Sequence, residues 1–451
     1  MHTLFIEVDT ESTWAVASLG PAFLAPYLRQ HGHTTAFLRA QLGQSDADLV
    51  AAVRAEQPDL IGLSLTSRQW HRARDLMRAV RAEIDVLIVA GGLHPTFAPE
   101  AVLAEPEFDF VCLGEGETAL LDLVNALETG DGDAVQGIDN IWAKHGPRPL
   151  MRTPYPVIDD LPFMDRGFLD EHQGVVHMAT QRGCPFPCTY CAARMYNELY
   201  REQKQDYGRR RSHANVLEEL FALRDAGKLA YVIFLDDTFT IHHPWVREFC
   251  KVYGEQLGTP FSLHARVETV NETMLHELAA AGCKHITYGV ESGSERIRRD
   301  VMHRPVRNQR FRDVFRWTRE AGIMVTANYM LGVPGETPAD LQATLDLAEE
   351  LDAADFGYFV FYPYPGTQLF RECREKGYLP DDFLQLPANH RTSVLRLPGL
   401  TQADIDAAYQ GFTRLRERVY LERYGAAVPV PGSADESDTA CGHVRDRART
   451  G

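Results

Sequence analysis

Residues 183–191 read Gly183-Cys184-Pro185-Phe186-Pro187-Cys188-Thr189-Tyr190-Cys191, with three cysteines at C-x3-C-x2-C spacing. The two prolines cannot continue a helix, so the segment must curl as a loop and can turn its sulfurs inward. Thiolates are soft ligands that suit iron–sulfur clusters. A four-iron four-sulfur cluster held by only three cysteines keeps one iron open to a small molecule, so the spacing predicts a reactive cluster.

Two other interpretations of these cysteines stay open, namely a structural zinc site and ordinary core cysteines. Zinc would require a fourth ligand and is more often held by paired C-x2-C knuckles. The remaining cysteines lack the spacing of a disulfide framework, so structural disulfides are not expected. They are Cys112, Cys250, Cys283, Cys373 and Cys441.

Length and charge limit the class of protein. The chain has 451 residues, of which 45% are hydrophobic, so two or three domains are expected. The net charge of −17 argues against a nucleic-acid partner or an anionic membrane surface, despite the basic run Arg209-Arg210-Arg211. No stretch approaches the roughly 18 apolar residues of a membrane span, and the first residues lack a signal-peptide pattern. We therefore expect a cytoplasmic protein.

Residues 1–130 alternate short apolar runs with amphipathic segments, which predicts a doubly wound parallel sheet of the Rossmann type. Ligands bind outside the carboxyl ends of the strands in such sheets. Small residues gather there, as Gly91-Gly92 after one strand and Gly114-Glu115-Gly116-Glu117 after the next. The predicted strands are residues 4–8, 35–38, 60–65, 86–90 and 110–113.

The rest of the chain divides into four parts. Residues 131–172, rich in Gly, Pro and Asp, are predicted to be a linker. Residues 173–367 hold six βα repeats, which indicate a partial (β/α)6 barrel with strands at 176–180, 231–235, 261–265, 285–290, 325–331 and 358–362. Residues 368–425 are a smaller, mostly helical region with a helix at 402–424, and the tail 426–451 is predicted to be disordered.

Polar residues follow the predicted barrel strands at the ends where barrel folds place active sites. Asp236 and Asp237 follow the second strand, where paired acids could bind an ammonium group. Arg266 follows the third strand and could fork onto a carboxylate. Glu291 follows the fourth strand and suits a ribose or an amino group. Each signal alone fits a turn or a helix cap equally well, so their order along the chain carries the argument.

With Arg182 before it and Tyr190 inside it, the cysteine loop resembles the cluster loop of the radical S-adenosylmethionine (SAM) superfamily. The order of strand-end motifs over residues 175–367 is similar to that of the same family. The resemblance implies that Cys184, Cys188 and Cys191 are catalytic and ligate a 4Fe-4S cluster whose open iron binds SAM. It also implies Asp236, Arg266 and Glu291 as SAM contacts, although Asp237 could exchange roles with Asp236.

Residues 1–130 resemble the cobalamin-binding domain that precedes the barrel in one branch of this superfamily. The matching pieces are Ser64-Leu65-Thr66, Gly91-Gly92-Leu93-His94 and Leu113-Gly114-Glu115-Gly116. The D-x-H-x-x-G motif, whose histidine coordinates cobalt in many cobalamin proteins, is absent, as it is in several members of the branch. The alternative is a domain that no longer holds cobalamin. The implied cofactor contacts are Thr66, Gly91, Gly92, His94, Gly114, Glu115 and Gly116.

Two residues of this domain allow two interpretations each. Trp70 could pack under the corrin ring, but an ordinary aromatic on a helix flank is favoured because its burial needs no cofactor. His94 could line a pocket or cap a turn.

The resemblance implies a methyltransferase. An external electron donor such as flavodoxin or ferredoxin would reduce the cluster, and cleavage of SAM would give a 5′-deoxyadenosyl radical. With cobalamin as methyl carrier, the expected reaction is methylation of an unactivated carbon, or of phosphorus, in a small-molecule substrate such as a specialised metabolite.

Other activities stay open. One is a radical SAM enzyme with a cobalamin-free N-terminal domain that transfers another fragment of SAM, cyclises or dehydrogenates. Another is an iron–sulfur electron carrier, against which the order of barrel-end motifs argues. The substrate is expected between the barrel and residues 368–424, where the candidate contacts are Tyr329, Tyr362, Tyr364 and His390.

Overall fold

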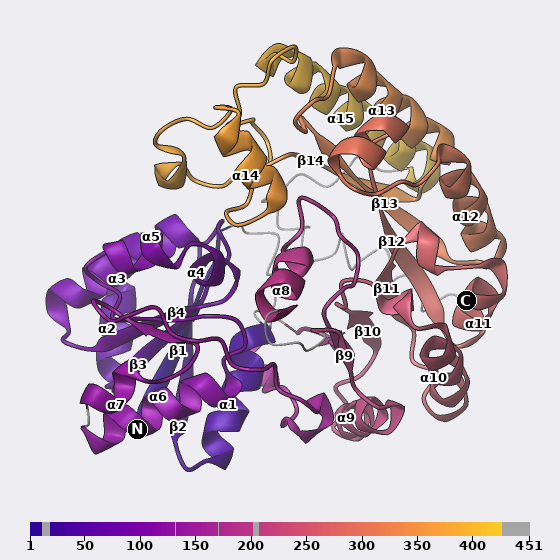
Figure 1. The fold of residues 1–451 in the computed structure, drawn as a ribbon. Coiled ribbons are helices and arrows are strands. Elements are labelled where there is room, and N and C mark those ends of the chain that lie inside the picture. The colour runs from indigo at the N-terminus through magenta and orange to yellow at the C-terminus, as the bar shows by residue number, and fades with distance from the viewer. Residues whose placement is uncertain (11–18, 131, 170, 202–206, 426–451) are drawn as a thin grey trace.

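The computed structural model describes residues 1–10, 19–130, 132–169, 171–201 and 207–425. They form two six-stranded sheets and a two-stranded sheet between them (Figure 1). The predicted α/β class, with a doubly wound domain ahead of a partial barrel, is confirmed. The predicted tail at 426–451 lies outside the described residues.

The first sheet has the strand order β2-β1-β3-β4-β5-β6, and all its pairs are parallel except β5 with β6. Its strands carry almost unbroken apolar sequence because helices cover both faces. Helices α1 and α6 pack on one face, and α2 and α3 on the other. The strands are β1 His2–Val8, β2 Thr34–Ala40, β3 Leu60–Ser64, β4 Leu87–Gly91, β5 Phe110–Cys112 and β6 Ile141–Ala143. The helices are α1 Leu19–Gln30, α2 Asp46–Glu56, α3 Trp70–Glu83, α4 Leu93–Phe97, α5 Pro99–Ala104, α6 Glu117–Thr129 and α7 Gly132–Gln136.

Strand β6 was not expected, because residues 131–172 were predicted to be a linker. Ile141 to Ala143 pair antiparallel with Phe110 to Cys112 and extend the first sheet. Three residues are too few to show an alternation in the sequence, so only the pairing partner reveals this strand.

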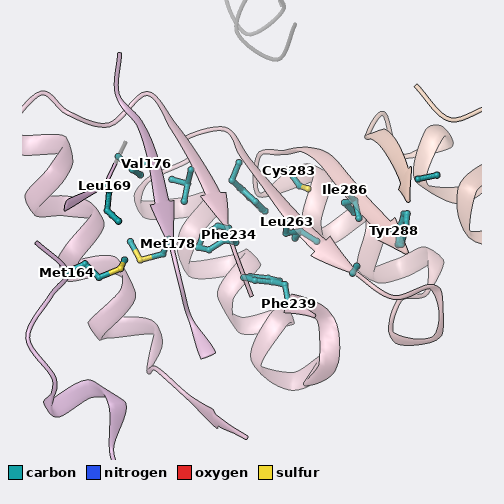
Figure 2. Close-up of a cluster of buried hydrophobic side chains, with 14 of the residues drawn as sticks. Met164, Leu169, Val176, Met178, Phe234, Phe239, Leu263, Cys283, Ile286 and Tyr288 are labelled. Carbon is teal, nitrogen blue, oxygen red and sulfur yellow. The ribbon is translucent and has the colours of Figure 1, made fainter. Parts of the chain in front are cut away.

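The second sheet is entirely parallel, with the order β14-β13-β12-β11-β10-β7. Helices α9 to α13 cover its outer face, and Figure 2 shows part of that apolar layer. Its strands are β7 Val175–Met178, β10 Tyr231–Phe234, β11 Phe261–Ala265, β12 Cys283–Glu291, β13 Met324–Leu331 and β14 Asp355–Val360. Its helices are α8 Ala192–Arg201, α9 His213–Asp225, α10 His243–Gln256, α11 Glu272–Ala280, α12 Asn308–Glu320 and α13 Pro338–Leu351.

The remaining elements lie around this barrel. The short pair β8 Gln181–Arg182 and β9 Arg209–Arg210 was not predicted from the sequence. Helix α14 spans Gln368–Glu375, and helix α15 spans Gln402–Tyr424 as predicted, starting with a Thr401 and Asp404 capping box. No helix in the described ranges is both long and apolar enough to span a lipid bilayer.

Candidate functional site

The cysteine loop lies between β8 and α8. Cys184 and Cys188 are buried and Cys191 is half-buried. Gly183 has φ of +92°, and a Cβ there would lie 2.8 Å from the Tyr207 ring, so only glycine fits this turn. Asn197 of α8 donates a 2.7 Å hydrogen bond to the carbonyl of Cys184. The N-terminal end of the loop is thus fixed by its neighbours.

The surroundings of the sulfurs fit an iron–sulfur cluster. The Arg266 guanidinium donates to Cys188 Sγ at 2.9 Å, a contact that suits a thiolate. Burial raises the pKa of the Cys191 thiol to about 12 and also raises that of Cys184, so both need a cationic partner to ionise. Iron supplies that charge.

The thiols are not gathered around a single point. Among the described residues, no group of three or more His, Cys, Asp or Glu side chains is close enough to hold one metal ion. In a four-iron cluster, by contrast, each thiolate binds its own iron. The geometry therefore gives no support to the zinc alternative.

Asp236, a predicted SAM contact, forms its hydrogen bonds within the protein. Its buried carboxylate accepts hydrogen bonds from the Thr180 amide (2.8 Å), the Thr180 hydroxyl (2.6 Å) and the Gln181 amide (2.9 Å). Burial raises its pKa to about 6. The carboxylate therefore holds the strand that leads into the cysteine loop, a positioning role that the sequence did not reveal.

Asp237 instead lies near the sulfurs. Its side chain is exposed to solvent, yet the surrounding protein desolvates the carboxyl enough to raise its pKa. Its negative charge also raises the pKa values of Cys184 and Cys191. Of the two neighbouring acids, Asp237 is the one placed to meet a ligand on the cluster.

Glu291 has an unusual backbone conformation for a residue with a side chain. Its φ is +71°, and the pairing of β12 with β13 shifts register between Gly289 and Glu291. A Cβ at Gly289 would lie 2.2 Å from Glu291 Oε1, so the carboxylate folds back over that glycine. Strain of this kind persists mainly at functional sites, which supports the predicted role of Glu291.

A buried charge network joins Glu291 to the cysteine loop. Arg304, 2% exposed, lies 3.4 Å from Glu291 Oε1 and 3.3 Å from Glu268 Oε2. Arg266 contacts Glu268 Oε1 at 2.5 Å, and Tyr190 hydrogen-bonds Glu291. Glu268 and Arg304 were missed in the sequence, although the Arg266-x-Glu268 spacing hinted at a local pair.

Glu336 was not among the predicted site residues. It follows β13 in Gly332-Val333-Pro334-Gly335-Glu336, and its buried Oε2 accepts from the amides of Gly332 and Val333 at 2.8 Å. Burial raises its pKa to about 8. The carboxyl therefore shapes the loop at the end of β13.

The predicted cobalamin residues gather at the carboxyl edge of the first sheet. Gly92 has φ of +91°, and a Cβ there would lie 2.7 Å from the Leu65 amide, so two loops pass in close contact. Thr66 donates its amide and hydroxyl to the Gln69 side chain at 2.9 and 3.0 Å. Gly91 ends β4, and Gly116 precedes α6. The small residues therefore let the strand-end loops of this sheet pack closely, and their contacts with cobalamin stay a prediction.

His94 and Trp70 form one stacked pair, with ring centroids 5.0 Å apart. Trp70 is 3% exposed and also packs on Phe108, so it is the core aromatic that the sequence favoured. His94 Nδ1 lies 3.0 Å from Ser67 Oγ, while its buried Nε2 has no hydrogen-bond partner within the described part of the chain. Burial lowers its pKa to about 4.

Glu115 and Gly114 meet the barrel domain rather than open space. The Glu115 carboxylate pairs with Arg209 and lies 3.2 Å from Arg182. The Glu115 amide donates to the Tyr200 hydroxyl at 2.9 Å, and a Cβ at Gly114 would lie 2.2 Å from that oxygen. The Glu115 side chain therefore forms ion pairs between the two domains, and its contact with cobalamin stays a prediction.

The predicted substrate contacts separate into two groups. Tyr329 is buried and packs against Phe412 of α15 on the outer face. Tyr364 and His390 come together, with 2.9 Å between the Tyr364 hydroxyl and His390 Nε2. Tyr362 stacks on Phe383.

Comparison with known proteins agrees with this geometry. The family model for the radical SAM superfamily matches residues 178–348, and the model for the B12 binding domain matches residues 12–124. An uncharacterized methyltransferase of Pyrococcus horikoshii, PH0819, is 30% identical over 369 residues, which cover 78% of this chain and 77% of that protein.

Two further proteins are similar over most of the chain. The cytidylyl-2-hydroxyethylphosphonate methyltransferase of Streptomyces wedmorensis is 26% identical over 438 residues, covering 85% of this chain and 80% of that one. The radical SAM methyltransferase TsrM of Kitasatospora setae, solved with cobalamin and a [4Fe-4S] cluster, superposes with a TM-score of 0.72 at 16% identity, over 96% of this chain and 92% of that one. The chain is an enzyme that belongs to the radical SAM superfamily, in the branch whose barrel follows a B12-binding domain.

Proposed function

We propose that the protein is a cobalamin-dependent methyltransferase that methylates a carbon or phosphorus atom of a small molecule. One observation carries the proposal. Arg182, two residues before Cys184, is held by Glu115 and Glu117 of the B12-binding domain. The loop predicted to bind the cluster is therefore fixed against the loop predicted to bind cobalamin, as a reaction that uses both cofactors requires.

Each residue has a defined role in this proposal. Cys184, Cys188 and Cys191 hold the cluster, and Arg266 stabilises the negative charge on Cys188. Glu291 and Asp237 face SAM, while Asp236 positions the strand that leads into the loop. When bound, the cluster and SAM supply a carbon-centred radical, and cobalamin supplies a transferable methyl group.

The domain boundaries belong to the proposal as well. Residues 1–130 would carry cobalamin, 173–367 would cleave SAM, and 368–425 would cover the substrate. An external electron donor such as flavodoxin or ferredoxin would reduce the cluster.

A cofactor analysis tests the proposal. The protein is expressed anaerobically with cobalamin supplied, its cluster is reconstituted, and its visible spectrum is recorded with iron and cobalt analysis. We expect about four irons and one cobalt per chain. A Cys184→Ala, Cys188→Ala, Cys191→Ala variant is the control and should retain cobalt without iron. Four irons without cobalt would overturn the methyltransferase proposal and favour a cobalamin-free radical reaction.

A further inference from the structure

The two faces of the second sheet differ in character. On the outer face, Phe234, Leu263, Ile286 and Tyr288 are buried against helices, as Figure 2 shows for this apolar cluster. Tyr288, for example, lies 5.5 Å from the Phe315 ring of α12. Side chains on a strand alternate between faces, so the residues between these point to the opposite, inner face. That inner face is half-buried along β11, β12 and β13.

Polar residues occupy most of this inner face. The strand register places His264 beside Thr287, Thr287 beside Thr326, and Thr326 beside Asp355, so one polar row crosses four strands. His285 stands below this row, and its Nε2 lies 2.7 Å from Thr326 Oγ1. The interior of a closed barrel is normally filled by bulky branched apolar residues. The second sheet is an open partial barrel, so polar side chains on its inner face can meet water or a ligand.

Several of these polar groups have no partner. Within the described ranges, the side chains of Ser262, His264, Thr287 and Asn328 make no hydrogen bond, ion pair or ring contact. Each is half-buried, so each remains open to a molecule on the inner face. Unpaired polar groups in a protein interior are destabilising unless water or a ligand satisfies them.

Asn328 lies between two glycines on the neighbouring strands. The register aligns Gly289, Asn328 and Gly357 in one row across β12, β13 and β14. A Cβ at Gly357 would lie 2.7 Å from Asn328 Oδ1, so a side chain there would crowd the amide. Gly289 is two residues before Glu291, which places this row about 7 Å below the predicted SAM contact.

The inner face offers hydrogen bonds but no unpaired charge. Threonine, serine and asparagine are neutral, and burial lowers the pKa of His264 and lowers that of His285 to about 4, so both imidazoles are neutral near pH 7. Asp355, at the edge of the row, is already occupied by Arg416 at 3.1 Å and the Tyr420 hydroxyl at 3.0 Å. An ionic ligand would therefore find no opposite charge to compensate its desolvation.

We propose that the inner face of the second sheet binds an uncharged, hydrogen-bonding part of the substrate, such as a ring amide, through Asn328, Thr287 and His264. This subsite rests on the proposed function, because it lies beneath the residues predicted to hold SAM. It narrows the substrate class to molecules with a neutral polar portion next to the reacting atom.

A matched set of five-membered rings tests the proposal. Crystals of the reconstituted holoenzyme are soaked separately with 2-pyrrolidinone (neutral amide), cyclopentanecarboxylate (anion), cyclopentylammonium (cation) and cyclopentene (apolar). We expect 2-pyrrolidinone on the inner face with its amide bonded to Asn328. Occupancy there by a charged or apolar ring instead, or by ordered water only, would overturn the proposal.

Variants test the same contacts in solution. Asn328→Leu and Thr287→Val replace the polar groups with apolar groups of similar shape, and each should weaken 2-pyrrolidinone binding by about tenfold, the effect of one lost hydrogen bond. Lys284→Met, at an exposed position on the same strand, is the control and should bind it as the wild type does. Ligand-observed NMR measures the affinities, and melting curves confirm that each variant is folded. Unchanged affinity in both folded variants would overturn the proposal.

Ring binding and methyl transfer are measured independently, so the two proposals can fail separately. Binding of the ring requires neither cobalamin nor turnover. A protein that cleaves SAM in a cobalamin-loaded state but leaves the inner face empty contradicts the subsite alone. A protein that binds 2-pyrrolidinone but takes up no cobalt contradicts the methyltransferase alone.

Discussion

Arg182 forms a 2.5 Å ion pair with Glu117, and the pair joins the two domains at the base of the cysteine loop. The Glu117 side chain is 5% exposed and that of Arg182 is 17% exposed, so water screens the pair poorly. Arg182 also lies above the Phe23 ring, 5.2 Å from its centroid. The barrel therefore presents a cation to the B12-binding domain two residues before Cys184.

Removing one partner of this pair should destabilise both domains. Arg182→Gln leaves Glu117 buried without the cation that it contacts, while Glu115 keeps Arg209, and the expected loss is about 3 kcal/mol in the free energy of unfolding. Urea unfolding of the reconstituted protein measures it, together with iron content. Arg182→Lys should recover only part of the stability, because an ammonium group cannot fork onto two carboxylates. Equal stability of all three proteins would contradict this account of the interface.

Glu291 offers a test that separates binding from strain. Glu291→Ala should weaken SAM binding without removing iron, because in our proposal the carboxylate contacts SAM and not the cluster. Glu291→Gly should lose the same affinity but be more stable than Glu291→Ala by about 1 kcal/mol, since glycine tolerates the φ of +71°. Equilibrium dialysis with SAM and thermal melting provide the two measurements. An Ala variant with wild-type SAM affinity would refute the binding role.

The neighbouring acids Asp236 and Asp237 should behave differently. The carboxylate of Asp236 accepts three hydrogen bonds, and Asp236→Asn replaces one of its oxygens with an NH2 group that faces an N–H or hydroxyl donor. This change should lower the free energy of unfolding by about 1–3 kcal/mol and reduce iron retention. Asp237→Asn should retain iron and weaken SAM binding, because Asp237 lies near the sulfurs and is proposed to contact SAM. The experiment compares iron content and SAM affinity of both variants. The reverse pattern would restore Asp236 as the SAM contact.

Glu336 predicts a dependence of stability on pH. Burial raises its pKa from 4.5 to about 8, and its Oε1 has no hydrogen-bond partner among the described residues, so the folded protein holds the proton. The unfolded chain releases that proton at lower pH, so the stabilisation is fully present below pH 4.5 and is lost as the pH rises to 8. Between pH 6 and pH 8, the free energy of unfolding should therefore fall less in Glu336→Gln than in the wild type. An equal fall in both proteins would show that Glu336 is already ionised.

Local sequence patterns predicted most of the fold. The eleven strands expected in the two large sheets are present, and helix 402–424 has the predicted bounds. These elements carry strong apolar periodicity of their own. Strands β6, β8 and β9 were missed because each is two or three residues long and exists only through its partner strand.

The site was predictable to a smaller extent. The spacing of Cys184, Cys188 and Cys191 predicted a cluster loop, which the structure places between β8 and α8, and Glu291 ends β12. The partners of Asp236 and Glu115 could not be predicted, because their hydrogen bonds join residues 56 and 94 positions apart in the chain. A carboxylate looks the same in sequence whether it faces a cofactor or an arginine of another domain.

The two products of SAM test the central claim most directly. Reduced, reconstituted enzyme loaded with cobalamin is incubated with SAM, and 5′-deoxyadenosine and S-adenosylhomocysteine are quantified by mass spectrometry. A radical methyltransferase with both cofactors should form both products. The cobalamin-free enzyme should form only 5′-deoxyadenosine, and the triple cysteine variant none of it. Formation of 5′-deoxyadenosine alone by the cobalamin-loaded enzyme would contradict methyl transfer as the function of this protein.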